Sequence, residues 1–582
     1  MPWVASWRSE SPIYPGDLTA RGKTSAAKPL WFQLEAKNSG SAGVSKTGGL
    51  IVLLKKFAFA TALTLAAFTV QAQAQEPRRG GTIRFTAPYG ASFVSNDSHV
   101  SNQIQDEIYG YALHGMLFRW DSKAGKPEPE LVKSVTTSAD GLTHTLKLRD
   151  DAFFHNGRKM TADDVIWSFT RLVDGSKNYP GARHVSRIKG GAEVRKGEAK
   201  EISGLKKIDD FTIEMTMTDG VDPGFLFYSA PTAIMPAKEA QEPDFFNKPI
   251  GLGPFKFVEH VPGSRMVFER WDKYYKAGKP YADRLVISPM GEAAARDVAF
   301  RNKEIDVSIL GSTQYVAYKA DPNLSKGILE VAEVFTRNMG MNPEFKPFSD
   351  KRVRQAINHA IDSELIIKRL VRDKAYRAVS WLPSSVPGFD KDAKSYAFDP
   401  EKAKKLLTEA GYPDGFEFEW TATPNESWGI PIVEATIPML AKVGIKVKVK
   451  PVETSALGGV IAKGDFQAYI WSNTSGPDPL TALKCFHSTT PRSSCNYTTF
   501  KSPAYDKVLD EAAAEKDAGK KLALLTKANA MLQDEAPVWF FNYNKAVLAY
   551  QPWLHGLQAN ATELALQRYE DLWVDASSPA AK

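Results

Sequence analysis

Residues 143–171 read as a strand, a turn and a helix in immediate succession, and this segment limits the possible folds of the chain most strongly. In its first part, Leu146 and Leu148 alternate with polar residues, which is the period-two pattern of a half-buried strand. The residues His155-Asn156-Gly157 then supply a turn, because Asn and Gly tolerate positive φ.

The helical part of this segment carries its own start signal. Thr161 can cap the helix by accepting a hydrogen bond from the amide of Asp164, and Asp163 and Asp164 place negative charge at the positive end of the helix dipole. An apolar stripe at three-to-four spacing is formed by Val165, Ile166, Phe169 and Leu172. Together the strand and the helix predict one well-formed αβ unit.

A candidate secretory signal peptide lies at residues 51–74. Two lysines precede fourteen residues without a charge, 57–70, and Ala72-Gln73-Ala74 forms a small-x-small cleavage site. The apolar run is too short to span a membrane, and its flanking lysines fit a buried core helix poorly. We expect cleavage at the end of this segment. Residues 1–50 lack a sustained period, so we expect them to be disordered or to precede the true start codon.

Once this leader is set aside, the chain is close to neutral. Residues 1–74 hold eight of the 74 Lys and Arg and three of the 67 Asp and Glu, so residues 75–582 carry 66 basic and 64 acidic side chains, a net charge of +2. They show no basic cluster interleaved with aromatic residues, which argues against nucleic-acid binding. These 508 residues exceed what one core usually supports, so two or three lobes are expected. The sequence has no later run of eighteen apolar residues and no cysteine at the cleavage site, which predicts an exported protein without a membrane anchor.

The chain has only two cysteines, Cys485 and Cys495, in a loop rich in Ser, Thr and Pro. In an exported chain such a pair is most simply a disulfide. Closing this ring would contribute roughly 2.5–3 kcal/mol in the loop-entropy description. The alternative is a metal site that includes His487, although further ligands are missing from the nearby sequence.

Two later segments predict helices with clear boundaries. In residues 351–362, one helical face is apolar and comprises Val353, Ala356, Ile357, Ala360 and Ile361. In residues 398–412, Asp399 is placed to cap a helix, Pro400 occupies its first turn and Gly411 ends it.

The segment 143–171 closely resembles the signature of the family 5 extracellular solute-binding proteins, the peptide-, nickel- and opine-binding components of bacterial ABC importers. Seven further segments resemble this family in the same order, and they are residues 80–85, 249–257, 270–287, 303–310, 351–362, 398–412 and 444–453. The resemblance covers residues 80 to about 552, so the chain is identified as a member of this family of the peptide-, dipeptide- and oligopeptide-binding type.

The resemblance implies an α/β fold, a two-lobed periplasmic binding protein with a third, smaller domain, mixed sheets with flanking helices, and a hinge. The first lobe would comprise residues 75–118, 243–343 and 545–582. Residues 119–242 would form the small extra domain, and residues 344–544 the second lobe. Ligand would be trapped between the lobes when they close.

The ligand site is expected in residues 468–479, where a predicted strand ends and breaks into polar residues, Gly and Pro. Trp471 offers a flat apolar surface for stacking a ligand, although it also fits a core position at a domain interface. In oligopeptide- and dipeptide-binding relatives, an aspartate three residues after this tryptophan receives the peptide α-ammonium, whereas here that position is Thr474. The nearest acid is Asp478, which equally fits a turn before a proline. Since a buried ammonium without a carboxylate costs several kcal/mol, either Asp478 takes over this role or the ligand lacks a free α-amine.

Five further residues are candidates for ligand contact. Asn473 lies in the same stretch as Trp471. Ser101, Asn102 and Gln103 align roughly with the segment that contacts peptide backbones in relatives, and they also fit a loop at the entry of a helix. Trp381 is a candidate because of its location in the resemblance.

Enzyme motifs are missing from the sequence. It contains no G-x-S-x-G, H-E-x-x-H or Walker loop, and no two of its nine histidines lie three to five residues apart. We expect no catalysis, no cofactor and no bound metal. The resemblance implies a monomeric periplasmic protein that captures a short peptide or similar solute and delivers it to an ABC permease. The alternatives are an opine, a sugar-like solute or a nickel chelate as ligand and, in a different class, a secreted peptide hydrolase or chaperone-like holder.

Overall fold

The strand, turn and helix predicted at residues 143–171 are present in the computed structural model. The strand is β5 (Thr143–Leu148) and the helix is α3 (Ala162–Leu172). Thr161 is the N-cap residue of α3, and its backbone amide donates to the Asp164 carboxylate at 2.9 Å. The prediction for this segment is therefore confirmed, including its helix cap.

The structure describes residues 76–87, 93, 95–102, 104–425, 428–473, 476–562 and 566–582. The predicted signal peptide and the fifty residues before it lie outside these ranges. Residues 76–582 form one compact unit by their backbone contacts, so the residue bounds of the lobes and of the small domain stay a prediction.

The helix α3 packs on a four-stranded antiparallel sheet built from a contiguous part of the chain. The strand order is β4 (Val132–Thr137), β5, β7 (Thr212–Thr216) and β6 (Leu205–Asp209). Val165 and Phe169, on the predicted apolar stripe of α3, are fully buried in the core of this part. Burying the stripe on the sheet is what stabilises a helix of this length.

A second four-stranded sheet joins distant parts of the sequence. Its order is β1 (Thr82–Ala87), β10 (Arg284–Pro289), β9 (Arg265–Arg270) and β8 (Phe255–Val261). The first two strands are parallel and the others antiparallel. A small sheet pairs β2 (Phe118–Asp121) with β3 (Lys126–Pro129), and another pairs β18 (Leu554–His555) with β19 (Trp573–Val574).

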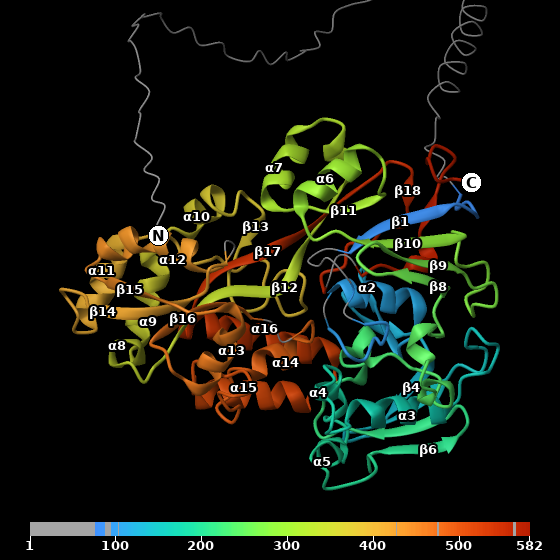
Figure 1. Cartoon of the computed structure of the whole chain (residues 1–582). Helices are drawn as coiled ribbons and strands as arrows, with labels where there is room; N and C mark the ends of the chain where they lie inside the picture. Colours follow the sequence, from blue (N-terminus) through green and yellow to red (C-terminus); the bar gives the residue numbers. More distant parts are fainter. Residues whose placement is uncertain are drawn as a thin grey trace, which may run out of the picture. The chain divides into compact units, whose positions relative to one another are not determined.

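The largest sheet is mixed, and two long strands form its centre (Figure 1). These are β12 (Ile328–Met341) and β17 (Val538–Tyr550), which pair with each other in antiparallel fashion. The other strands of the sheet are β11 (Val307–Ile309), β13 (Ala375–Arg377), β14 (Glu417–Ala422), β15 (Lys446–Pro451) and β16 (Ala468–Asn473). The β12–β17 ladder changes register between Ala332 and Thr336. Since β17 pairs with β11 near one end and β12 pairs with β16 near the other, these two strands connect the segments predicted to form the two lobes.

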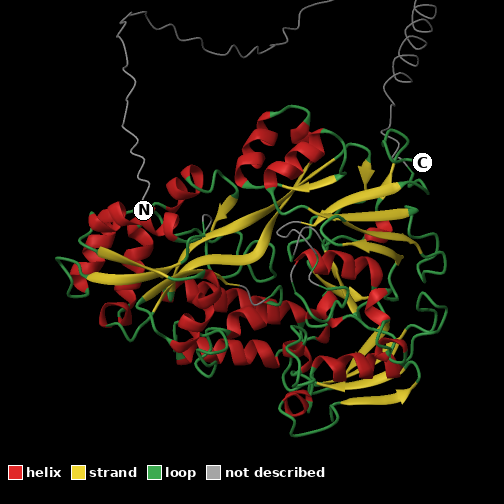
Figure 2. Cartoon of the chain, in the orientation of Figure 1, coloured by secondary structure: helices red, strands yellow, loops and turns green. Residues whose placement is uncertain are grey.

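Helices pack around the strands throughout the described chain (Figure 2). Besides α3 they are α2 (Ile104–Leu113), α4 (Ala182–Val185), α5 (Gly191–Arg195), α6 (Ala293–Arg301), α7 (Ser312–Ala320), α8 (Lys346–Ser349), α9 (Lys351–Ala360), α10 (Ser363–Arg369), α11 (Pro400–Glu409), α12 (Ile430–Ala441), α13 (Thr454–Lys463), α14 (Pro479–Lys484), α15 (Pro503–Ala514) and α16 (Ala518–Glu535). Within the described ranges, none of the helices combines the length and the apolarity needed to cross a membrane.

The predicted boundaries of α9 and α11 agree with the structure. The apolar face of α9 is buried, with Val353 and Ile357 fully inaccessible. The Asp399 side chain caps α11 by accepting a hydrogen bond from the amide of Lys402, and Gly411 follows the helix with φ of +88°. Only glycine adopts this conformation without strain, which explains why the helix stops there.

A buried ion network joins segments that are distant in the sequence. The guanidinium of Arg119 lies 3.7 Å from the carboxylate of Glu130 and 3.5 Å from that of Glu570. The Lys276 ammonium lies 2.9 Å and 2.8 Å from the same two carboxylates. The side chains of the arginine and of both acids are at most 3% exposed, so two cations and two anions balance each other inside the protein.

Two buried histidines are held in the neutral form. The ring of His99 accepts a hydrogen bond from Arg171 at 2.8 Å and donates to the backbone oxygen of Ala233 at 2.8 Å. Burial, and then the cation of Arg171, lower the pKa of His99 to about 4. Neither ring nitrogen of His114 has a hydrogen-bond partner among the described residues. Burial, and then the neighbouring His99 and His155, lower its pKa to about 3.

The predicted disulfide between Cys485 and Cys495 is present. It closes the loop that follows α14, and Cys485 is buried. The alternative of a metal pair with His487 is therefore wrong, because both thiols are used in the bond.

Replacing Cys485 and Cys495 together by serine should lower the free energy of unfolding by about 2.5–3 kcal/mol, since the open chain regains loop entropy in the unfolded state. Urea titration of the oxidised protein and of the double variant measures this difference. Added reductant should destabilise the native protein and leave the variant unchanged. An equal response of both proteins to reductant would contradict the prediction.

Candidate functional site

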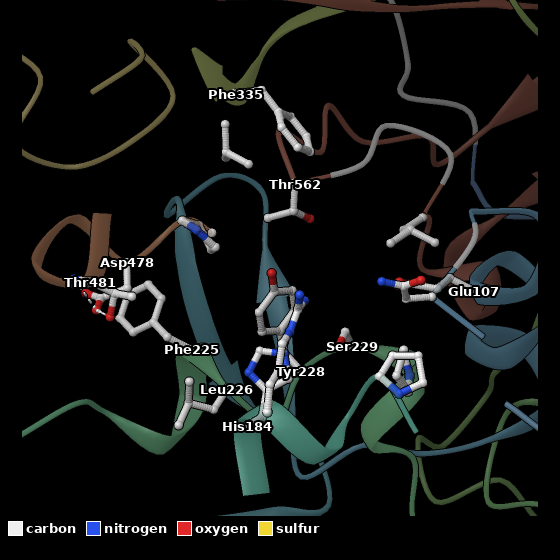
Figure 3. Close-up of a pocket in the computed structure, with 18 of the residues that line it drawn as sticks. Glu107, His184, Phe225, Leu226, Tyr228, Ser229, Phe335, Asp478, Thr481 and Thr562 are labelled. Atoms are coloured by element: carbon white, nitrogen blue, oxygen red, sulfur yellow. Dashed lines mark hydrogen bonds between the residues drawn. The ribbon is translucent and has the colours of Figure 1, made fainter. Parts of the chain in front are cut away.

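The candidate site is a cavity of about 530 Å³ lined by two groups of residues from distant parts of the chain. The first group comes from residues 102–231 and the second from residues 334–566. Figure 3 shows Glu107 on one side of the cavity and Asp478 with Thr481 on the other. A volume of this size suits a small solute.

Each wall is positioned by a defined element. Glu107 lies in the first turn of α2, and Arg183 lies in α4. The facing wall includes Phe335 from the long strand β12 and Asp478 at the start of α14. The disulfide also lines the cavity through both cysteines, so it fixes the loop at this wall.

The cavity contains apolar surface beside its charged groups. Phe225, Tyr228 and Phe335 contribute aromatic rings. The backbone oxygen of Tyr228 accepts a hydrogen bond from the hydroxyl of Tyr111 at 2.8 Å, which fixes this segment against α2. Such rings can contact the apolar parts of a ligand of variable identity.

Glu107 is a half-buried residue whose side chain lines the cavity. No described residue forms a hydrogen bond or an ion pair with its carboxylate. Burial raises the pKa of Glu107 to about 8, against the lowering effect of the Arg183 cation and together with a smaller rise from Asp106. An uncompensated acid of this kind, in a cavity, is a candidate functional group.

Arg183 is the cationic counterpart of Glu107 on this wall. Its Nε donates to the Nε2 atom of His184 at 3.1 Å, and no described carboxylate pairs with its guanidinium. The neighbouring Arg187, by contrast, is paired with Asp219 at 2.7 Å. The cavity can therefore offer one acid and one guanidinium to a ligand that carries both charges.

Asp478 lines the cavity, but its carboxylate also has a structural role. It is the N-cap of α14, where Oδ2 accepts from the amide of Thr481 at 3.0 Å and from the hydroxyl of Thr481 at 2.5 Å. This helix cap agrees with the interpretation of Asp478 as a turn residue before a proline. A contact between Asp478 and a ligand stays a prediction.

Trp471 lies in β16, and its side chain is half-buried. Its ring centroid is 5.6 Å from that of Tyr497, and it packs with Leu457 and Ile461 in a small apolar cluster. It is not among the residues that line the 530 Å³ cavity. Its stacking on a ligand therefore stays a prediction.

The location expected for Trp381 needs correction. Its side chain is 6% exposed, its indole N–H donates to the backbone oxygen of Ala482 at 3.2 Å, and its ring packs edge-on against Phe486. Trp381 is thus a core residue and not a residue of the cavity wall. The core position suits this side chain, because its apolar ring is buried while its indole N–H keeps a hydrogen-bond partner.

Of the remaining predicted residues, the structure describes Asn102, Ser101 and the backbone of Asn473. Asn102 is exposed and lines the cavity, whereas Ser101 is 6% exposed. The backbone of Asn473 pairs with Thr336 at the end of β16. Gln103 and Thr474 lie outside the described residues.

Sequence reasoning missed Glu107 and Arg183. The acid stands in a helix that is otherwise mostly apolar and buried, and this contrast was the available signal. Arg183 lies in a four-residue helix without a pattern of its own. Within the described residues, no group of three or more His, Cys, Asp or Glu side chains could hold a metal ion.

Comparison with known families identifies the class of protein. Residues 126–494 match the bacterial extracellular solute-binding proteins, family 5 (middle part). This match spans more than half of the chain, so the chain belongs to that family and is a solute-binding protein.

The individual relatives share less than 30% of their residues with this chain. The chain is 29% identical over 441 residues to heme-binding protein A of Haemophilus influenzae, covering 70% of this chain and 78% of the relative. It is 28% identical over 434 residues to the dipeptide-binding protein of Escherichia coli, covering 70% and 79%. The solved structure of HbpA2 from Haemophilus parasuis is similar with a TM-score of 0.75 at 22% identity, covering 85% of this chain and all of that one. These likenesses confirm the α/β, two-lobed periplasmic binding protein fold.

Proposed function

We propose that this protein captures a short peptide or a similar solute in the periplasm and delivers it to an ABC permease. The observation that carries the proposal is the cavity with an unpaired acid, Glu107, an unpaired guanidinium, Arg183, and aromatic surface. A short peptide has an ammonium, a carboxylate and apolar side chains, so it matches these three kinds of surface. The names of the relatives, which include a dipeptide-binding protein, support the same ligand class.

Export and delivery are parts of this proposal. The signal peptide predicted at residues 51–74 would send the chain to the periplasm, where a monomer would meet the permease. Membership in a family of binding proteins argues against the alternatives of a hydrolase or a chaperone-like holder.

The proposal is tested with protein purified from its own periplasm. Native mass spectrometry should show a bound solute of peptide mass, and calorimetry with alanine di-, tri- and tetrapeptides should show binding without turnover. If the bound solute is an opine, a sugar or a nickel chelate, the peptide is the wrong ligand class, and the role in solute capture stands. A cleaved peptide after incubation would contradict a role in transport.

A further inference from the structure

We infer that Glu107 is the acid that receives the cationic group of the ligand, on the wall opposite to the segment that follows β16. This inference rests on the proposed function and deepens it, because it assigns the ligand class as a solute with a free amine or another cation. It places the cation site on α2, whereas the sequence directs attention to Thr474 and Asp478.

Among the described residues, two acids line the cavity, and they differ in what they already bind. Asp478 accepts two hydrogen bonds from Thr481 through Oδ2 and caps α14. Glu107 has no such bond with any described residue, and its half-buried side chain lines the cavity. The acid without a partner is therefore the one available for a ligand, and using Asp478 would weaken a helix cap.

The charges around Glu107 favour a cation. The groups that interact with it electrostatically are Asp106 and Tyr111 on α2, Arg183 on α4, and Tyr228. Burial outweighs Arg183 and raises the pKa of Glu107 to about 8, so the carboxyl group is mostly protonated at pH 7. A cation that arrives at this group stabilises the carboxylate, so the carboxyl proton leaves to solvent as the ion pair forms.

The position of Arg183 also predicts how the ligand is oriented in the cavity. Its guanidinium belongs to the same cavity and pairs with no described carboxylate. An anionic group of the ligand placed there, with the cation at Glu107, neutralises both ends of the site. A zwitterion such as an unblocked peptide satisfies both groups, whereas a blocked peptide leaves one of them unpaired.

The test compares trialanine with N-acetyl-trialanine by titration calorimetry at pH 7.0 in phosphate and in Tris, two buffers with different heats of ionisation. Trialanine should bind the native protein with release of nearly one proton, and its affinity should rise between pH 6 and pH 8. Glu107→Gln should weaken trialanine by about tenfold or more and abolish the proton release. N-acetyl-trialanine should bind the native protein weakly and should respond little to this substitution.

Two control variants isolate the role of the acid. Glu193→Gln removes an exposed acid of α5 outside the cavity, so it should leave both affinities and the proton release unchanged. Arg183→Met should weaken trialanine more than trialanine amide, because it removes the partner of the carboxylate. Thermal unfolding of each variant verifies that it folds.

The outcomes separate the inference from the proposed function. Equal affinities of the free and the acetylated peptide, or an unchanged proton release in Glu107→Gln, would overturn the role of Glu107 while peptide binding stands. Absence of binding by both peptides would overturn the proposed function, and the inference with it.

Discussion

Replacing Arg119 by methionine is expected to destabilise the protein by about 3–5 kcal/mol. The substitution leaves Glu130 and Glu570 buried with one cation, Lys276, between them. Burial alone would raise the pKa of Glu570, but the cations of Arg119 and Lys276 outweigh it and hold the pKa well below its usual range. Without Arg119, one of the two buried carboxylates lacks a compensating cation, and an uncompensated buried charge destabilises the folded protein.

Urea unfolding at pH 7 measures this effect against a matched surface pair. Lys206→Met breaks the ion pair between Lys206 and Glu214, whose side chains are 62% and 31% exposed, and it should cost less than about 1 kcal/mol. Arg119→Lys keeps the charge, so its loss in the free energy of unfolding should lie between those of Arg119→Met and Lys206→Met. If Arg119→Met costs no more than the surface variant, the network does not stabilise the fold.

The same network contributes to the response of the protein to acid. The folded-state pKa of Glu570 is lowered, so its contribution to stability is complete above the unfolded-state value and is lost as the pH falls below about 4.5. In Arg119→Met, this part of the acid response should be smaller.

A second large loss of stability is expected between pH 6.5 and pH 4, and it comes from His114. Its pKa is lowered from 6.5 to about 3 in the folded protein, so the unfolded chain binds a proton that the folded protein does not. Stability is therefore complete above pH 6.5 and falls as the pH decreases through this window. At pH 4 this residue alone should account for a loss of about 3 kcal/mol.

The variant His114→Leu tests this assignment because it removes the titrating ring from the core. Its free energy of unfolding should lie within about 1 kcal/mol of the native value at pH 7.5, since neither ring nitrogen has a hydrogen-bond partner among the described residues. Between pH 6.5 and pH 4 it should lose about 3 kcal/mol less than the native protein. Parallel pH profiles of the two proteins would exclude His114 as a source of acid sensitivity.

Features that depend on short stretches of chain could be predicted from the sequence. The alternation in β5, the cap of α3 by Thr161 and Asp164, and the glycine after α11 involve neighbours within a few residues. The disulfide was predictable for a related reason, because an exported chain with two cysteines has one possible pairing.

The candidate site was less predictable because distant segments form it. Trp381 was a candidate for ligand contact because of its location in the family resemblance, yet its ring packs against α14 and Phe486. Glu107 has no motif around it and becomes notable only when the wall from residues 334–566 faces α2. No periodicity within a helix encodes such a neighbour.

The sequence by itself determined the family, the αβ units with their caps, and the disulfide, because these depend on local hydrogen bonding, on side-chain periodicity and on the count of cysteines. Only the tertiary structure decided which side chains share the cavity and which of its acids is already bound. The physical reason is that burial, and with it the pKa of Glu107, is set by residues from elements far away in the chain.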